Sequence, residues 1–285
     1  MPLLSPRSRI DDYELVRHVT TGAMSEVYEG RHLTSGLRVA VKVLSPELCE
    51  HEELVARFRN EGHTLLSLSH AHLVRVFACG DLPEGVPYTV LEWLPVDLHQ
   101  AMSRTSEPLP PHTAMQVARQ LAEALDALHT HGIIHRDLKP SNVLLSHEGS
   151  SGWDVKLADL GLAKARPETQ SPSAKPVSTG SGTLLGTWDY MAPEQWIQSK
   201  GVDAQVDVYA LGVLLFQMLT GRLPFIAELQ KDLMFFHLFE QPPLEQLEGR
   251  APASTRELIA RMLDKNPSRR PTMREVSHST PPTHS

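Results

Sequence analysis

The chain has 285 residues, of which 41% are hydrophobic and 21% are charged, so it can bury a substantial core in one large domain or in two lobes. Its formal net charge of −7 excludes a general nucleic-acid or membrane binder, which would carry a basic surface. The only two cysteines are Cys49 and Cys79, which excludes a disulfide framework and favours a reducing compartment.

Neither a signal peptide nor a membrane span is expected. The N-terminal sequence MPLLSPRSRI has no long apolar core. The longest apolar block, ALGVLLFQML at residues 210–219, is about half the length that a bilayer requires. The sequence therefore predicts a cytoplasmic protein without a membrane segment.

In the N-terminal third, the sequence pattern predicts a tail at residues 1–12, followed by short strands and one helix. The strands are rich in β-branched and aromatic residues. They fall at residues 13–19, 26–32, 38–44 and 88–94. Between the third and fourth strands, residues 53–69 have helical spacing of apolar side chains, with Gly62 as a weak point.

From about residue 97 the pattern changes to helices. An apolar stripe at residues 114–128 stops before Gly132, and a second helix at residues 206–219 stops before Gly221. Residues 254–264 predict a third helix. The chain thus predicts a small strand-rich lobe and a larger helical lobe, joined near residues 92–95.

No regular structure is expected in two segments of the chain. Residues 167–185 consist mainly of Ser, Thr, Pro and Gly without periodicity, which is typical of a long functional loop or of disorder. The last residues, 276–285, are expected to form a polar tail. The chain contains no internal repeats.

The stretch IIHRDLKPSNVLL at residues 133–145 places charged side chains and a proline between apolar residues. A buried strand would not accept Pro140, which cannot donate to a ladder, or the charges of Asp137 and Lys139. The pattern predicts a polar loop held between apolar anchors, an arrangement that fixes catalytic groups at a surface. The expected anchors are Ile133, Ile134, Val143 and Leu144.

HRDLKPSN at residues 135–142 resembles the catalytic loop of the eukaryotic-type (Hanks-type) serine/threonine protein kinases, and further kinase motifs follow in the required order. The motifs are VAVK ending at Lys42, a helical Glu61, DLG at 159–161, MAPE at 191–194, VDVYALG from Val206 and RRP ending at Pro271. Lys139 favours serine/threonine over tyrosine kinases. The usage of Ala, Pro and Leu favours a bacterial member.

The resemblance implies an α+β, bilobal protein-kinase-like fold. The kinase domain is expected at residues 13–275, with an N-lobe at 13–93 and a C-lobe at 97–275. It also implies an enzyme that transfers the γ-phosphoryl group of ATP to Ser or Thr hydroxyl groups of a protein substrate.

Catalysis of phosphoryl transfer depends mainly on positioning the reactants and neutralising their charge. The resemblance implies that each site residue contributes to one of these two effects. On the third predicted strand, Lys42 would hold the α- and β-phosphates and Glu61 would orient its amine. Asp137 would accept the proton of the attacking hydroxyl, and Lys139 would neutralise the transferring phosphate. Asn142 and Asp159 would supply hard oxygen ligands for Mg²⁺, with Mn²⁺ as an alternative.

The resemblance also implies an ATP pocket. The phosphate-covering loop, the sheet and the segment between the lobes contribute its residues. They are Val19, Thr20, Gly22, Ser25, Val27, Ala40, Lys42, Leu91, Glu92, Leu94 and Leu144.

The phosphate-covering loop departs from the family pattern, because only Gly22 remains of three glycines, with Thr20 and Ser25 at the outer positions. Glycines let backbone N–H groups approach phosphates closely. This change motivates an alternative, a pseudokinase that serves as a binding or scaffold module. The retained charged residues favour catalysis. A third alternative, a small-molecule phosphotransferase, is disfavoured by MAPE and Arg270.

Regulation by phosphorylation is a further expectation. A phosphate on the 167–185 loop would pair with Arg136, with Lys164 or Arg166 as partners, and two copies of the chain would phosphorylate each other. The candidate acceptors are Ser171, Ser173, Ser178, Thr179, Ser181 and Thr183. Thr187 and Leu160 are expected to have structural roles.

Three structural predictions complete the sequence analysis. The resemblance implies that Glu194 and Arg270 form a buried ion pair and that Asp207 accepts hydrogen bonds from the backbone of the catalytic loop. The histidines at 129, 131 and 135 spell H-x-H-x₃-H, but the first two close a helix and need not converge on zinc with the third.

Overall fold

The computed structural model describes residues 3–22, 24–149, 152–159, 188–197 and 201–279. The chain divides into two compact units, which meet in the sequence between Pro95 and Val96. Each unit is described by itself below. No described helix is both long and apolar enough to cross a membrane.

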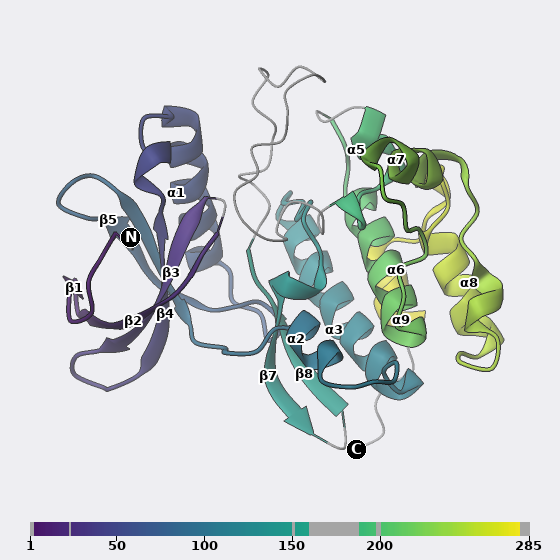
Figure 1. The fold of residues 1–285 in the computed structure, drawn as a ribbon, viewed down its shortest axis with the longest axis horizontal. Helices are drawn as coiled ribbons and strands as arrows, with labels where there is room; N and C mark the ends of the chain where they lie inside the picture. Colours follow the sequence, from purple (N-terminus) through teal and green to yellow (C-terminus); the bar gives the residue numbers. More distant parts are fainter. Residues whose placement is uncertain (1–2, 23, 150–151, 160–187, 198–200, 280–285) are drawn as a thin grey trace. The chain divides into compact units, whose positions relative to one another are not determined.

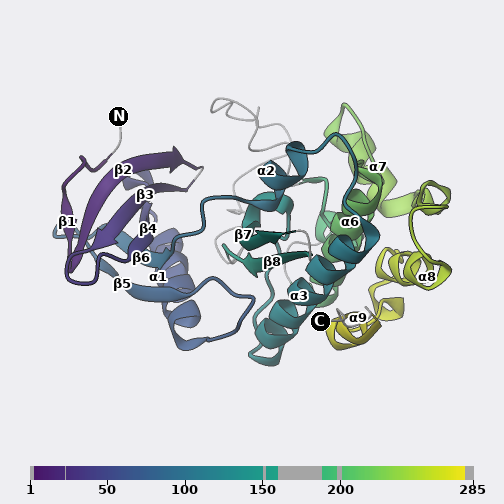
Figure 2. The same ribbon diagram turned by 90° about the horizontal axis from the view of Figure 1, so that it is seen from below.

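Unit 1, up to Pro95, contains a six-stranded antiparallel sheet with the strand order β1-β2-β3-β4-β6-β5 (Figures 1 and 2). Its α-helix, α1, packs against β5 and β6. The elements are β1 (Arg9–Ile10), β2 (Tyr13–Thr21), β3 (Ser25–His32), β4 (Arg38–Leu44), the 3₁₀ helix η1 (Pro46–Leu48), α1 (Glu52–Ser67), β5 (Val76–Asp81) and β6 (Pro87–Glu92).

Strand β4 shows how the sheet separates a core face from a site face. Val39, Val41 and Val43 alternate along the strand and are 0% exposed, because successive side chains of a strand point to opposite faces. Ala40 and Lys42, between them, are half-buried on the other face. The valine face belongs to the hydrophobic core of unit 1.

Unit 2, from Val96 onward, is mainly helical and has one two-stranded hairpin (Figure 1). Its described elements are α2 (Leu98–Ser103), α3 (Pro111–Thr130), η2 (Pro140–Asn142), β7 (Val143–Gly149), β8 (Gly152–Leu157), α5 (Pro193–Ile197), α6 (Gln205–Thr220), α7 (Gln230–Phe239), η4 (Leu244–Leu247), α8 (Ala253–Met262), η5 (Pro267–Arg269) and α9 (Met273–Ser279).

Helices α3 and α6 form the centre of unit 2. They lie side by side, and α3 also contacts β8 and α9 (Figures 1 and 2). The apolar stripe of α3 is buried, with Leu121, Leu125 and Leu128 at 0% exposed. Helix α6 is buried on almost every side, and it ends at Gly221, whose φ of 73° closes the helix in the left-handed region.

The observed architecture confirms the predicted class, α+β with a strand-rich unit followed by a larger helical unit. Two elements lie in the segments expected to be tails: β1 in residues 1–12, and the last turn of α9 in residues 276–279. Because β1 precedes the predicted strands, Lys42 lies on the fourth strand rather than the third. The expected loop at 167–185 and the end of the polar tail, 280–285, lie outside the described residues.

Candidate active site

The register of the sheet brings predicted nucleotide-binding residues of unit 1 to one face. Thr20 is paired with Val27, Val27 with Lys42, and Ala40 with Leu91. Residues that are directly opposite in an antiparallel pair share a face of the sheet. Residues from four strands thus surround Lys42 on the face opposite the buried valines.

The predicted phosphate-covering loop is a tight hairpin. Strand β2 continues to Thr21 and β3 begins at Ser25, and the Gly22 N–H donates to the Ser25 carbonyl oxygen at 2.8 Å. The Gly22 φ lies outside the left-handed region. Ser25 is buried, whereas Val19 is 38% exposed. The glycine substitutions therefore leave a hydrogen-bonded turn between the strands.

The segment that follows β6 presents backbone groups at the edge of unit 1. The Glu92 N–H is already bonded to the carbonyl oxygen of Arg75 at 2.8 Å. The backbone of Leu94 makes no hydrogen bond within the described residues. Glu92 and Leu94 are the two predicted ATP-pocket residues of this segment, and within the described residues Leu94 keeps its N–H available for a ligand.

Lys42 and Glu61 lie together, with 3.5 Å between Nζ and Oε1 and with side chains that are only 17% and 10% exposed. Glu61 reaches Lys42 because α1 packs closely on the sheet. A Cβ atom at Gly62 would lie 2.9 Å from Thr89 Oγ1 and 3.2 Å from Cys79 Cβ. The glycine that weakens the helix in the sequence is thus the residue that permits this approach.

In unit 2, Asp137 forms the centre of a cluster from the polar loop. The Asn142 Nδ2 donates to Asp137 Oδ2 at 2.9 Å and to the Asp137 carbonyl oxygen at 2.8 Å. The Lys139 Nζ lies 3.2 Å from Asp137 Oδ2. Two predicted residues, Lys139 and Asn142, therefore contact the carboxylate of a third, Asp137, which is 7% exposed.

The loop is anchored differently from the prediction. Of the four expected anchors, only Val143 is fully buried, and Ile133, Ile134 and Leu144 are half-buried. The loop instead buries its own Leu138, at 1% exposed, and its polar residues His135, Asp137 and Asn142. Burial of these polar groups is possible because each has hydrogen-bond partners.

Asp207, at the start of α6, holds the loop backbone as predicted. Its Oδ2 accepts from the His135 N–H at 2.9 Å, and its Oδ1 accepts from the Arg136 N–H at 2.8 Å. The His129 Nε2 lies 2.8 Å from Oδ2. Arg136 has a φ of 63°, a conformation that non-glycine residues adopt rarely. The buried carboxylate thus fixes an unusual turn immediately before Asp137.

The hairpin β7–β8 places the last predicted site residues near this cluster. The Ala158 N–H donates to the Asn142 carbonyl oxygen at 2.8 Å, and the Ala158 carbonyl oxygen is 3.1 Å from His135 Nε2. Asp159 follows at once, exposed and with a φ of 56°. Leu144, paired with Lys156, is half-buried on the hairpin.

The donor atoms fit a nucleotide and a divalent metal ion. The Asn142 amide nitrogen is used by Asp137, which leaves its oxygen as the ligand atom. That oxygen and the Asp159 carboxylate are hard donors of the kind that Mg²⁺ prefers. No group of three His, Cys, Asp or Glu side chains able to hold a metal occurs in the described part of the chain.

The three histidines of the H-x-H-x₃-H pattern have separate partners. His129 contacts Asp207, His131 Nδ1 lies 2.8 Å from the Ala127 carbonyl oxygen, and His135 contacts Ala158. Sequence reasoning missed the role of His129 beside Asp207. The i, i+6 spacing to His135 at a helix end was the only available indication.

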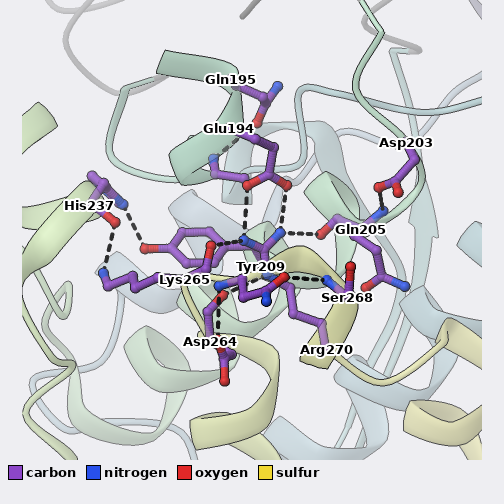
Figure 3. A network of polar contacts seen from close by, with 12 residues as sticks. Glu194, Gln195, Asp203, Gln205, Tyr209, His237, Asp264, Lys265, Ser268 and Arg270 are labelled. Carbon is purple, nitrogen blue, oxygen red and sulfur yellow. Dashed lines mark hydrogen bonds and ion pairs between the residues drawn. The ribbon is translucent and has the colours of Figure 1, made fainter. Parts of the chain in front are cut away.

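Figure 3 shows the predicted ion pair of Glu194 and Arg270 with its surroundings. The Arg270 Nη1 also donates to the Gln205 carbonyl oxygen at 2.9 Å, and Nε donates to that of Asp264 at 2.8 Å. The guanidinium carbon lies 4.9 Å from the centre of the Tyr209 ring. The pair therefore joins α5, α6 and the segment after α8.

A second buried pair in Figure 3 was not predicted from the sequence. The Tyr209 hydroxyl and His237 Nδ1 are 2.9 Å apart, and both residues are 0% exposed. Burial, with the nearby charge of Lys265, lowers the pKa of His237 to about 3. Burial lowers the pKa of Lys265 to about 8, and its Nζ donates to the His237 carbonyl oxygen at 2.8 Å.

Several predictions cannot be placed, because they fall outside the described residues. They concern Leu160, Lys164, Arg166, Thr187 and the candidate phosphate acceptors Ser171, Ser173, Ser178, Thr179, Ser181 and Thr183.

Curated proteins similar to this chain are bacterial serine/threonine kinases. The serine/threonine-protein kinase Pkn1 of Myxococcus xanthus is 38% identical over 263 residues, which cover 92% of this chain and 36% of Pkn1. PknB of Mycolicibacterium smegmatis is 33% identical over 272 residues, which cover 94% of this chain and 42% of PknB. The chain thus spans less than half of the length of either relative.

Solved structures show the same likeness. The kinase domain of PknI from Mycobacterium tuberculosis, a double mutant, matches with a TM-score of 0.71 and 25% identity over 98% of both chains. Rad53 1–466 in complex with AMP-PNP matches with a TM-score of 0.74 and 25% identity, over 93% of this chain and 64% of Rad53. Residues 13–280 match the family described as "Protein kinase domain". The chain therefore belongs to the protein kinase domain family.

Proposed function

We propose that the chain is an ATP- and Mg²⁺-dependent serine/threonine protein kinase. Membership of the family implies the use of ATP, of a divalent metal ion and of a protein substrate. The choice of Mg²⁺ rests on the oxygen donors of Asn142 and Asp159. The choice of Ser and Thr acceptors rests on Lys139 and on the names of the relatives.

The observation that carries the proposal is the Asp137 cluster. A buried carboxylate lies 3.2 Å from one lysine amine and accepts a hydrogen bond from one amide. The amide bond fixes the direction of the carboxylate, and the lysine supplies positive charge beside it. A carboxylate held in this way can accept a proton from a substrate hydroxyl while the adjacent amine faces the transferring phosphate.

The proposed reaction is a direct transfer. The acceptor hydroxyl loses its proton to Asp137, its oxygen bonds to the γ-phosphorus of ATP, and the bond to the β-phosphate oxygen breaks to release ADP. Lys42, oriented by Glu61, binds the α- and β-phosphates. A metal ion, when bound, would neutralise phosphate charge, and Asn142 and Asp159 would be its protein ligands.

The nucleotide would lie on the sheet face that carries Lys42. Val27, Ala40 and Leu91 offer apolar contacts to the base, and the free N–H of Leu94 offers a hydrogen bond. We assign the remaining contacts to the β2–β3 hairpin, to the end of β6 and to β7. These residues are Val19, Thr20, Gly22 and Ser25 of the hairpin, Glu92 of β6 and Leu144 of β7.

Regulation and location complete the proposal. Arg136, next to Asp137, would bind a phosphate placed on the chain's own Ser or Thr residues by a second copy. The protein would act in the cytoplasm, where ATP is available and thiols stay reduced, and Cys49 and Cys79 are both free.

A phosphate-transfer assay with γ-labelled ATP and a generic Ser/Thr-containing protein tests the proposal. The parent should transfer phosphate, and both Lys42→Met and Asp137→Asn should transfer it far more slowly, by about 10²- to 10⁴-fold for Asp137→Asn. ATP binding is measured in parallel by calorimetry. A parent that binds ATP without transferring phosphate would establish the pseudokinase alternative and overturn the proposal.

A further inference from the structure

A cavity of about 860 Å³ opens in unit 2 between α2, the segment joining α2 to α3, and the C-terminal end of α6. Its volume lies within the range of roughly 300–1,000 Å³ that is typical of ligand pockets. Polar side chains and backbone form most of its wall, and its apolar side chains are those of Met102, Pro108 and Leu109. Such a wall suits a peptide segment better than an apolar small molecule.

The charge of this cavity is opposite to that of the whole chain. Its ionisable residues are His99, Glu107, Arg222 and Arg250, so two guanidinium groups face one carboxylate, in a chain with a net charge of −7. Within the described residues, neither arginine side chain has a hydrogen-bond or ion-pair partner. The cavity therefore offers two guanidinium groups against one carboxylate, that of Glu107, and so carries a net positive charge.

The walls that carry these groups are held by hydrogen bonds. The Leu109 N–H donates to the Met218 carbonyl oxygen at 2.9 Å, which fixes the α2–α3 segment to α6. Thr220 Oγ1 accepts from the Arg222 N–H at 3.2 Å and donates to the Phe216 carbonyl oxygen at 2.8 Å. The backbone at Arg222 is thus fixed to the end of α6, so the point from which its side chain starts is already set before a ligand binds.

One side-chain contact connects the cavity to the neighbourhood of Asp137. Gln217 lines the cavity, and its Oε1 accepts from the Tyr190 hydroxyl at 2.6 Å. On the other side, Tyr190 lines a second, small cavity together with Arg136 and Asp137. Gln217 and Tyr190 thus connect the wall of the larger cavity, which carries Arg222, to the wall of the small cavity beside Asp137.

We infer that this cavity binds an acidic segment of the protein substrate, whose Glu or Asp carboxylates pair with Arg222 and Arg250. The inference rests on the proposed kinase function and adds a substrate class to it. Both arginines are exposed, so each pair is screened by solvent and contributes modestly. Selectivity would come from two such pairs in one cavity, one with Arg222 after α6 and one with Arg250 after η4.

A structural explanation competes with this inference. Arg222 follows the C-terminus of α6, where a positive charge interacts favourably with the helix dipole. If that were its only role, Arg222→Gln would lower the Tm and would change the KM of every peptide equally. Selectivity between acidic and neutral peptides separates the two explanations.

The test uses the full chain and peptides that contain one Ser. In one series a Glu pair moves stepwise along the peptide, and in the matched series a Gln pair takes its place. The variants are Arg222→Gln, Arg250→Gln and the double variant. Arg274→Gln is the control, because Arg274 is exposed on α9 and does not line the cavity.

For at least one position of the Glu pair, we expect a KM about fivefold lower than for the Gln peptide, which corresponds to about 1 kcal/mol. The double variant should lose this difference with its kcat unchanged, and the Arg274→Gln protein should retain it. Raising the salt concentration should also reduce the difference, since exposed charges are screened. A preference that is absent at every position, or that survives in the double variant, would overturn the inference.

A binding measurement separates failure of the inference from failure of the proposed function. Anisotropy of a labelled Glu peptide is measured with the Asp137→Asn protein, which needs no catalysis. If the parent phosphorylates no peptide but the Glu peptide binds through Arg222 and Arg250, the kinase proposal fails and the cavity is still an acidic-peptide site. If phosphorylation occurs without Glu preference and without binding, the cavity inference alone fails.

Discussion

Arg270 and Glu194, 76 residues apart in the sequence, form a two-bonded ion pair, with 2.6 Å between Nη1 and Oε1 and 2.9 Å between Nη2 and Oε2. The Arg270 side chain is 0% exposed and that of Glu194 is 21% exposed. Arg270→Met leaves a largely buried carboxylate without its partner, so unfolding free energy should fall by about 3–5 kcal/mol. Urea denaturation of the parent and of Arg270→Met measures this loss of unfolding free energy.

A surface ion pair in the same unit provides the control. Arg104 Nη1 is 3.3 Å from Glu148 Oε2, with side chains 54% and 42% exposed. Arg104→Met should cost less than about 1 kcal/mol. Equal losses in the two variants would contradict the special role of the buried pair.

Asp207→Asn tests whether the carboxylate below the catalytic loop positions Asp137. Asn keeps one acceptor oxygen, so one of the two loop amides loses its partner. An unpaired buried amide costs about 1–3 kcal/mol, and we expect kcat to fall about tenfold to a hundredfold. The KM for ATP should change little.

His129→Leu is the matched control for Asp207→Asn, because it removes the third contact to the carboxylate and keeps both amide bonds. Its kcat should fall much less. A kcat of Asp207→Asn equal to that of the parent would show that the loop holds its shape without this carboxylate.

The stability of the protein should depend on pH through His237. Burial, and next the charge of Lys265, lower its pKa to about 3, so the folded protein keeps it neutral while the unfolded chain protonates it near pH 6.5. Above pH 6.5, His237 is neutral in both states and causes no loss of stability. As the pH falls from 6.5 toward 3, the unfolded chain takes up a proton that the folded protein does not, and the free energy of unfolding falls by up to about 1.4 kcal/mol per pH unit.

Urea midpoints between pH 7 and pH 5 measure this effect. His237→Gln should be less stable at pH 7 but should have a shallower pH dependence than the parent. His278→Gln, at an exposed histidine of α9, should keep the parent's slope. An unchanged slope in His237→Gln would exclude His237 as the titrating group.

Gly22→Ala tests why the hairpin keeps one glycine. A Cβ atom there would lie 3.3 Å from the Ser25 carbonyl oxygen, and the backbone is not left-handed. Stability should therefore change by less than about 1 kcal/mol. The KM for ATP should rise severalfold, because the methyl group keeps the phosphates from the backbone.

Gly85→Ala should lower the stability of the protein without changing the KM for ATP, which is the reverse of the pattern expected for Gly22→Ala. Gly85 has a φ of 79° with open space around it, so alanine there strains the backbone and costs about 1–2 kcal/mol. Its KM for ATP should match the parent's. Gly22→Ala with an unchanged KM would mean that the phosphates do not approach this turn.

Strands with strong β-propensity were predictable from the sequence, and the bounds of β4 match the prediction. The sequence analysis missed β5, Val76–Asp81, because this edge strand is mostly half-exposed and contains Cys, Gly and Asp, which show no alternating pattern. Gly62 is a weak point of its helix when only the sequence is considered. The structure explains the glycine, because Thr89 and Cys79 leave no room for a side chain there. Sequence spacing alone does not reveal that these residues are neighbours.

Part of the site was predictable because its residues share short motifs. Asp137, Lys139 and Asn142 are neighbours in the sequence, and the structure brings them together. Hydrophobicity predicted the wrong anchors for their loop, whereas the family resemblance correctly predicted Asp207, a buried carboxylate on a distant helix that holds the loop backbone. The pairing of Tyr209 with His237 also depends on tertiary packing.

The most direct test of the central claim compares phosphate transfer by the parent and by Asp137→Asn at saturating ATP and Mg²⁺. Because Asp137 is assigned to proton transfer, kcat should fall by about 10²- to 10⁴-fold, while calorimetry should find similar ATP affinity for both proteins. Equal rates would contradict the assignment of Asp137 as the group that receives the substrate proton.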